Sequence, residues 1–186
     1  MPKHIEIVDE FNRPTGRQAT INQSLDKGLW HRGAVVVVCT KTGFILVQKR
    51  SSNMRMHPGQ LDISAGGFVD IGEDPEDTAI REVHEELGLT IHKSQLNFLY
   101  IHRKNHVLPR RQGFSRAFVY CYVICLPDEH VSIVPQAEEV AWARFLPYRT
   151  VRRMALGSAI RHIGRFEPRR AYYRRLLLAA KPFMKH

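Results

Sequence analysis

The chain has 186 residues, of which 44% are hydrophobic and 25% charged, and it carries a formal net charge of +10. This composition is typical of a soluble globular protein, and the length favours one domain with a sizeable core over two independent ones. No segment is long and apolar enough to span a bilayer and the polar start lacks the apolar centre of a secretory signal, so we expect a cytoplasmic protein without a membrane partner.

The cysteines and the net charge narrow the class of protein further. Cys39, Cys121 and Cys125 all lie in apolar runs, in odd number and without metal-like C-x-x-C spacing. This pattern predicts buried reduced thiols. The positive net charge favours anionic partners, either phosphorylated small molecules or nucleic acid, and does not distinguish between them.

The first part of the chain is predicted to be mostly strand. An alternating segment at residues 5–8 predicts an edge strand, and residues 12–16, Asn-Arg-Pro-Thr-Gly, predict a turn. The valine run at residues 33–39 predicts a buried strand. Residues 41–43 then predict a hairpin turn onto a second strand at residues 44–50.

A loop and a short strand come next. Residues 50–59 break all periodicity and predict a loop, and residues 61–65 predict a strand that leads directly to Gly66 and Gly67. Because glycine has no side chain, the backbone at this pair can come close to a ligand.

A helix with clear start and stop signals follows. Asp74 suits the N-cap position, Pro75 suits the first helical position, and Gly88 suits the end of the helix. The apolar residues that recur at helical spacing, and that we expect to face the core, are Ile80, Val83 and Leu87.

The remainder of the chain is predicted to contain further strands and a basic terminal helix. Residues 96–102, 114–126 and 137–145 predict strands, and residues 102–111 predict a basic loop. Residues 148–186 are strongly basic, and we expect them to pack on the same domain through a terminal helix that begins near Pro168. The apolar face of that helix is predicted to contain Tyr172, Tyr173, Leu176, Leu177, Leu178 and Ala179. A role of this segment in binding RNA is the less favoured alternative.

Three carboxylates are predicted to converge on the central helix. Glu82, Glu85 and Glu86 lie one turn apart on a face different from the apolar one, and such like charges repel. A divalent cation reverses that cost, and Mg²⁺ or Mn²⁺ is the natural candidate because carboxylates are its usual ligands. Arg81 can hold one carboxylate by a charge-assisted hydrogen bond. A Glu-rich helix face is also often simply solvated, so the helix alone leaves both interpretations open.

The spacing of residues over this loop and helix resembles the Nudix hydrolase signature, G-x5-E-x7-R-E-U-x-E-E-x-G-U, in which U is aliphatic. Its fixed positions are present at Gly67, Glu73, Arg81, Glu82, Val83, Glu85, Glu86, Gly88 and Leu89. The resemblance implies one Nudix domain over residues 1–186 that binds divalent metal and hydrolyses a diphosphate linked to another moiety. It also implies an α/β/α sandwich with a central mixed sheet, whereas periodicity alone predicts only a mixed α/β fold.

The resemblance also implies roles for individual residues. Glu82 and Glu86 are the first choices as metal ligands, with Glu85 a third ligand or the group that takes a proton from water. The backbone carbonyl of Gly66 is expected among the ligands, and Arg81 is expected to hold a glutamate in place. Which glutamate acts as the base stays open. We expect Gly67, Glu73 and Gly88 to shape the loop.

Candidate substrate-binding groups lie outside the signature. Basic residues in or beside predicted loops are the candidates, because binding groups concentrate there. They are Arg50, His57, Arg103, His106, Arg110 and Arg111. We expect a small-molecule diphosphate as the partner and a homodimer as a possible assembly, since Nudix proteins often pair. His31 is interpreted as a satisfied residue at a strand edge, with a role in the site left open.

Two narrower resemblances involve segments upstream of the helix. The first resembles the Nudix branch related to type 1 isopentenyl diphosphate isomerases. It rests on the order of four segments: Ile-Val-Asp-Glu with Pro-Thr-Gly, then Leu-Trp-His-Arg, then Ile-Leu-Val-Gln-Lys-Arg-Ser, then Pro-Gly-Gln-Leu-Asp-Ile-Ser-Ala-Gly-Gly. Those isomerases need a cysteine where this chain has Ala65, and their signature is degenerate, so hydrolysis is the better interpretation. Coenzyme A diphosphatases share Arg50 and Ser51, but His57 is displaced from their pattern.

The alternatives to a hydrolase of small diphosphates are therefore an isomerase-like protein acting on a prenyl diphosphate and an RNA-associated Nudix protein acting on 5′ ends. Both would use the same central helix, and the residues of the signature do not separate them.

Overall fold

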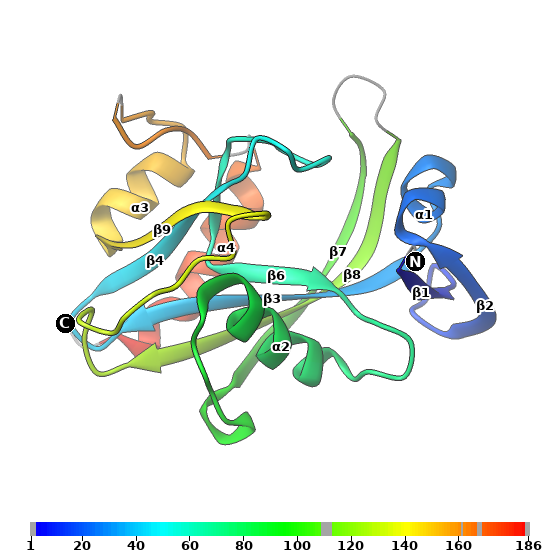
Figure 1. Cartoon of the computed structure of the whole chain (residues 1–186), viewed down its shortest axis with the longest axis horizontal. Helices are drawn as coiled ribbons and strands as arrows, with labels where there is room; N and C mark the ends of the chain where they lie inside the picture. The colour runs from blue at the N-terminus through cyan, green and yellow to red at the C-terminus, as the bar shows by residue number, and fades with distance from the viewer. Residues whose placement is uncertain (1–2, 109–112, 161, 167–168, 185–186) are drawn as a thin grey trace.

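The computed structural model describes residues 3–108, 113–160, 162–166 and 169–184 (Figure 1). The strands are β1 His4–Val8, β2 Pro14–Thr20, β3 His31–Thr40, β4 Phe44–Arg50, β5 Leu61–Ile63, β6 Ala65–Phe68, β7 Asn97–Val107, β8 Phe114–Leu126 and β9 Val140–Pro147. The helices are α1 Ile21–Lys27, α2 Pro75–Leu87, α3 Tyr148–Ala155 and α4 Arg170–Ala180, with short 3-10 turns at Lys93–Gln95 and Lys181–Phe183.

A mixed seven-stranded sheet forms the centre of the molecule, with strand order β5-β4-β3-β8-β7, β6 added beside β3 and β9 beside β4. The β3 and β8 strands are parallel, and the other pairings in this sheet are antiparallel. Helix α2 covers one face and α4 covers the other (Figure 1). The predicted α/β fold with a central mixed sheet is therefore confirmed.

Alternation along β3 explains why its valines form one continuous run. Val36 and Val38 face α2 and pack with Val83, whereas Val37 and Cys39 face the opposite core, which contains α4. Because successive side chains of a strand point to opposite faces, a strand covered on both sides is apolar throughout.

The strands β3 and β4 diverge soon after their hairpin turn. They share the pair Cys39 and Ile45, after which β4 pairs with β5 and β9 instead. Ser64 joins the two diverging strands, because its Oγ accepts from the Val38 amide at 2.9 Å and donates to the Leu46 carbonyl at 2.6 Å. The single strand predicted at residues 61–65 is thus wrong, and Ser64 separates β5 from β6.

Two further expectations need correction. Strand β7 continues to Val107, so the loop predicted at residues 102–111 is wrong over its first half. The hydrogen bonding of β7 to β8 extends this strand through a run of charged residues that composition alone marks as a loop. At the other end of the chain, the turn predicted at residues 12–16 is strand from Pro14 onward, because β2 pairs with β1 in a small separate sheet.

Helix α1 follows β2 and was not predicted. Thr20 caps it, since the Thr20 Oγ1 accepts from the Gln23 amide and the Gln23 side chain accepts from the Thr20 amide. This reciprocal pair is a capping box, a signal that the sequence contains as Thr-x-x-Gln.

Helix α4 of the basic C-terminal segment packs on the sheet. Tyr172, Tyr173, Leu176 and Leu177 are buried in the core that faces Val37 and Val123. Leu178 is 51% exposed, so its predicted place in the apolar face is wrong. Nothing in these contacts tests a role in RNA binding, which stays a prediction.

The predicted burial of the three cysteines holds for two of them, because Cys125 is only partly buried. Cys39, Cys121 and Cys125 are free thiols, and the first two are buried. Over the part of the chain that the structure describes, no helix combines the length and apolar character needed to cross a bilayer.

The docking of α4 yields a matched test. Leu176→Ala should destabilise the protein by about 2–5 kcal/mol, because Leu176 is fully buried and its truncation leaves a cavity. Leu178→Ala, two residues along the same helix, should change stability by less than about 0.5 kcal/mol. Urea unfolding of both variants measures the difference, and equal effects would contradict the observed orientation of α4.

Candidate active site on helix α2

Helix α2 begins and ends where its sequence signals predict. Asp74 occupies the N-cap position with extended backbone angles, Pro75 follows, and Gly88 ends the helix at a φ of 68°. The Asp74 side chain forms no capping hydrogen bond, so its charge contributes through the helix dipole. The helix packs on the sheet through Ala79, Val83 and Leu87, whereas the predicted Ile80 is only partly buried.

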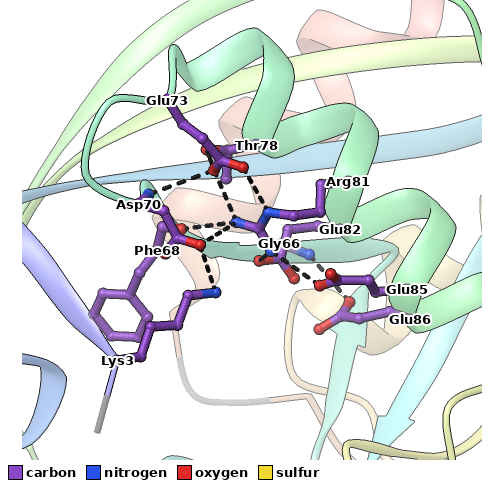
Figure 2. A network of polar contacts seen from close by, with 10 residues as sticks. All are labelled: Lys3, Gly66, Phe68, Asp70, Glu73, Thr78, Arg81, Glu82, Glu85 and Glu86. Carbon is purple, nitrogen blue, oxygen red and sulfur yellow. Dashed lines mark hydrogen bonds and ion pairs between the residues drawn. The ribbon is translucent and has the colours of Figure 1, made fainter. Parts of the chain in front are cut away.

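The three glutamates of α2 differ in their exposure. Glu82 and Glu86, one turn apart, are 6% and 2% exposed. The Glu85 side chain is 47% exposed. Figure 2 shows the carboxylates of all three on the side of the helix that faces Gly66. The structure thus brings the predicted carboxylates together, with two of them removed from solvent.

Glu86 is held from two directions. Its Oε2 accepts from the Gln48 side-chain amide at 2.9 Å and from the Gly66 backbone amide at 3.1 Å. Burial, reinforced by the charge of Glu82, raises the pKa of Glu86 to about 8. Burial also raises the pKa of Glu82. An ionised pair at this place therefore needs a compensating positive charge.

Arg81 supplies part of that charge and joins α2 to the preceding loop. Its Nη1 donates to Glu82 Oε1 at 2.8 Å and to Glu85 Oε2 at 2.9 Å. Its Nε donates to Glu73 Oε1 at 2.9 Å, and its Nη2 donates to the Phe68 carbonyl at 3.2 Å (Figure 2). The guanidinium thus fixes two of the three glutamates and the loop with one rigid, planar group.

Glu73 is the best-satisfied carboxylate of the network. It accepts from Arg81 and, at 2.7 Å, from the Thr78 hydroxyl. The hydrogen bond from Arg81 is the main reason why the pKa of Glu73 is lowered to about 2. These contacts anchor the loop to α2, and the loop-shaping role expected for Glu73 stays a prediction.

Gly66 and Gly67 allow close approach between β6 and its neighbours. A Cβ at Gly67 would overlap the carboxylate of Glu82, and a Cβ at Gly66 would lie 2.7 Å from the Ala34 carbonyl oxygen. Glycine is needed here for space, since a larger residue would displace Glu82 or separate β6 from β3.

A cavity of about 340 Å³ opens beside the glutamates and contains some of the predicted substrate-binding residues. Arg50 and His57 line it. Arg103 and His106 are not among its lining residues, and the Arg103 guanidinium lies 4.4 Å from the centroid of the Trp30 ring. Arg110 and Arg111 lie outside the described residues.

Three further lining residues were not among the predicted substrate-binding residues. Lys3 lines the cavity near Glu82, and its Nζ lies 2.9 Å from Asp70 Oδ2. Lys104 also lines it, although the sequence placed this residue in a loop. His31 is buried with its Nδ1 at 3.1 Å from the Leu29 carbonyl, as expected for a satisfied residue, yet it too contacts the cavity.

The donor set suits a hard divalent cation. The described residues contain no ready-made group of three or more His, Cys, Asp or Glu side chains around one point. Mg²⁺, however, usually takes only one or two protein carboxylates and keeps several waters. Glu82 and Glu86 provide such oxygens, and the nearby Gln48 Oε1 is a buried acceptor without a hydrogen-bond partner among the described residues. Mg²⁺ or Mn²⁺ therefore fits these residues.

The low pKa of Glu73 predicts a pH-dependent contribution to stability. An acid whose pKa falls from 4.5 to about 2 on folding stabilises the fold above pH 4.5, and this contribution is lost as the pH falls toward 2. Glu73→Gln should therefore lower the free energy of unfolding at pH 7 by about 1–3 kcal/mol and flatten its dependence on pH in that window. Urea unfolding between pH 2 and 7 measures both effects. Glu76→Gln, at a more exposed site on α2, is the control, and parallel curves for wild type and Glu73→Gln would contradict the anchoring role.

Comparison with known proteins places these observations in a family. A model of the NUDIX domain matches residues 29–165. The uncharacterized Nudix hydrolase SCO1686 of Streptomyces coelicolor is 31% identical over 77% of this chain and 74% of its own length. The uncharacterized Nudix hydrolase PA4841 of Pseudomonas aeruginosa is 32% identical over 76% of this chain and 77% of its own length. An uncharacterized Nudix hydrolase of Yersinia pestis, YPO2781, is 42% identical over 85 residues, and that match spans 46% of each protein.

Solved structures show the same fold at lower identity. Protein DR0079 of Deinococcus radiodurans superposes with a TM-score of 0.70 at 20% identity, covering 94% of this chain and 99% of that one. The NUDIX domain of Shewanella oneidensis NrtR, solved with ADP ribose, gives a TM-score of 0.53 at 19% identity and covers 66% of this chain and 75% of that one. The family match over residues 29–165, together with the two relatives that share more than 30% of their residues, shows that this chain belongs to the Nudix hydrolases, enzymes that act on pyrophosphate bonds.

Proposed function

We propose that this protein is a Mg²⁺- or Mn²⁺-dependent hydrolase that cleaves the diphosphate of a nucleoside diphosphate derivative or a related organic diphosphate. The observation that carries the proposal is the buried pair Glu82 and Glu86 beside a cavity that is also lined by cationic side chains. Nudix enzymes generally require divalent metal, and the ADP ribose bound to the related domain of NrtR supports a nucleoside diphosphate derivative as the substrate class.

Glu82 and Glu86 would hold the metal ion, with the Gly66 carbonyl as a further proposed ligand. The Gln48 and Gly66 amides fix the Oε2 atom of Glu86, which keeps this carboxylate turned in one direction. When bound, a divalent ion neutralises phosphate oxygens and lowers the pKa of an attacking water. The protein contributes a site whose ligands are already oriented.

Glu85 is suited to a different task. It is the most solvent-accessible of the three glutamates, lines the cavity and is held by Arg81 at 2.9 Å. A carboxylate in this position can take a proton from water while Arg81 keeps it in place. Glu85 is therefore our candidate for the general base, and Arg81 for the positioning residue.

Arg50 and His57 are the proposed contacts to the phosphate groups. Arg50 lies at the end of β4, and its Nε donates to the Met56 carbonyl at 3.0 Å, which fixes the path of the loop between them. Arg50, His57 and residues of the loop between them line the same cavity as Glu82 and Glu85.

The isomerase-like alternative receives no support from the site. Ala65, which replaces the cysteine of the isomerases, is buried in the core beneath α2 and offers no acidic group to the cavity. Hydrolysis is therefore the function that the residues present favour.

The first test of the proposal is the loss of the metal-binding carboxylates. Glu82→Gln and Glu86→Gln should each reduce turnover by at least about 100-fold, because each removes a charged oxygen that orients the reacting groups. Phosphate release from a panel of nucleoside diphosphate derivatives with Mn²⁺ measures the rate, and circular dichroism verifies the fold. Glu76→Gln, on the same helix, should retain the wild-type rate. Full activity in either site variant would contradict the assigned roles.

The buried pair also predicts how metal affects stability. Because the pKa of Glu86 rises from 4.5 to about 8 on folding, the metal-free protein should lose stability as the pH increases through this range. Glu86→Gln should therefore raise the Tm of the metal-free protein at pH 7.5 by at least about 2 °C. Mn²⁺ should raise the Tm of wild type and leave that of the variant unchanged. Thermal unfolding of both proteins with EDTA and with Mn²⁺ measures these Tm values. An equal increase in Tm with Mn²⁺ for wild type and Glu86→Gln would contradict the role of Glu86 as a metal ligand.

A further inference from the structure

The excess of positive charge in this protein comes from the last quarter of the chain. Residues 1–139 contain 16 Lys and Arg against 17 Asp and Glu, whereas residues 140–186 contain 12 Lys and Arg against one acidic residue, Glu167. Glu167 lies outside the described residues. The net charge is therefore concentrated in one segment, and a charge concentrated in this way acts on anions at one region of the surface.

The helices α3 and α4 present many of these cations to solvent. Val151 and Met154 of α3 lie in the same buried cluster as Leu176 and Leu177 of α4, so the apolar face of each helix is covered by the core. The arginines of both helices lie outside this core and are exposed. They are Arg149, Arg152 and Arg153 on α3 and Arg170, Arg174 and Arg175 on α4.

The two sets of arginines come together where α3 ends and α4 begins. The helices are in direct contact, and a Cβ at Gly157, just after α3, would overlap the Arg170 guanidinium. Arg152 and Arg153 belong to the last turn of α3. Arg170 is the first residue of α4, and Arg174 follows it by about one helical turn. This junction therefore gathers cationic side chains from both helices in one part of the surface.

The charge of these arginines is not balanced by nearby acids. No carboxylate of the described residues forms an ion pair with Arg152, Arg153, Arg170 or Arg174. None of the four lines the cavity beside α2, so they make no contact within the proposed active site. Like charges gathered in one place repel one another, and a bound polyanion would relieve that repulsion.

The chemistry of the surface favours a nucleic-acid backbone over a lipid bilayer. An amphipathic helix that lies on a membrane inserts its apolar face into the lipid. In α3 and α4 the core already covers that face, and Leu178 is the one large apolar side chain exposed on the described residues of these helices. Guanidinium groups, by contrast, bind phosphate oxygens through paired hydrogen bonds and need no insertion.

We propose that Arg152, Arg153, Arg170 and Arg174 form a binding surface for the phosphodiester backbone of a nucleic-acid strand. The surface is separate from the cavity beside α2, and the proposal does not depend on the proposed hydrolytic function. Because its contacts are made to phosphates, the surface binds without selecting a base sequence.

The salt dependence of binding tests this surface. Fluorescence anisotropy with labelled single-stranded RNA and DNA of one sequence measures Kd, in EDTA so that no metal-dependent cleavage occurs. Four phosphate contacts predict that Kd rises about 50-fold between about 50 and 200 mM KCl, because salt competes with the release of counterions. Arg152→Gln combined with Arg174→Gln removes two contacts and should reduce this rise to about 7-fold. Arg152→Lys combined with Arg174→Lys keeps the charge and should preserve the rise.

The control is Arg17→Gln combined with Lys41→Gln, which removes the same net charge from exposed positions on β2 and in the turn after β3. This variant should keep the wild-type salt dependence, and circular dichroism verifies the fold of every variant. Binding of RNA, of DNA or of both with this pattern supports the surface.

Three results would overturn the proposal. The first is no binding of either oligonucleotide at low salt, and the second is a salt dependence that Arg152→Gln with Arg174→Gln leaves unchanged or that the control reduces equally. The third comes from sedimentation with vesicles that contain phosphatidylserine. Binding to these vesicles without binding to either oligonucleotide would assign the surface to a membrane instead.

Discussion

The burial of two carboxylates within one turn of α2 is the constraint on which the rest of the site depends. Glu82 and Glu86 are removed from water, and each raises the cost of ionising the other. Arg81 offsets part of that cost on the side of Glu82, where it also holds the loop through Glu73. On the side of Glu86 the hydrogen-bond donors among the described residues are the neutral amides of Gln48 and Gly66, and the charge of Arg50 only partly opposes the effect of burial on the pKa of Glu86. A divalent cation, as proposed above, would offset the charge that remains on the pair.

The fold makes room for this pair by separating two strands. If β3 and β4 stayed paired along their whole length, the sheet would be continuous beneath α2. Instead they part after Cys39 and Ile45, and Ser64 bridges the gap where β5 and β6 begin. Gln48 on the diverging β4 can then reach Glu86, while β6 brings Gly66 to the same carboxylate. One local divergence of strands thus positions the donors that orient the carboxylate.

The helix was predictable from the sequence because its determinants are local. Its start at Pro75, its end at Gly88 and the convergence of its glutamates follow from caps and helical spacing alone. The surroundings of the helix were not predictable in this way. Lys104 and Arg103 are adjacent in the sequence, but the pairing of β7 with β8 sends only Lys104 into the cavity. Pairing register and strand divergence arise from contacts between distant segments, which spacing does not reveal.

The cavity is built partly by local sequence and partly by tertiary contacts. The side that contains the glutamates is made by a local motif that the family shares. The remaining lining comes from strands and a terminal helix that meet only in the folded chain.

The most direct measurement is anomalous diffraction from crystals of the protein soaked in Mn²⁺. A buried carboxylate pair that exists to hold a divalent ion predicts a strong anomalous peak within coordination distance of Glu82 and Glu86. A soak without a peak at this place, or with ordered Mn²⁺ only elsewhere on the protein, would contradict the metal-dependent mechanism.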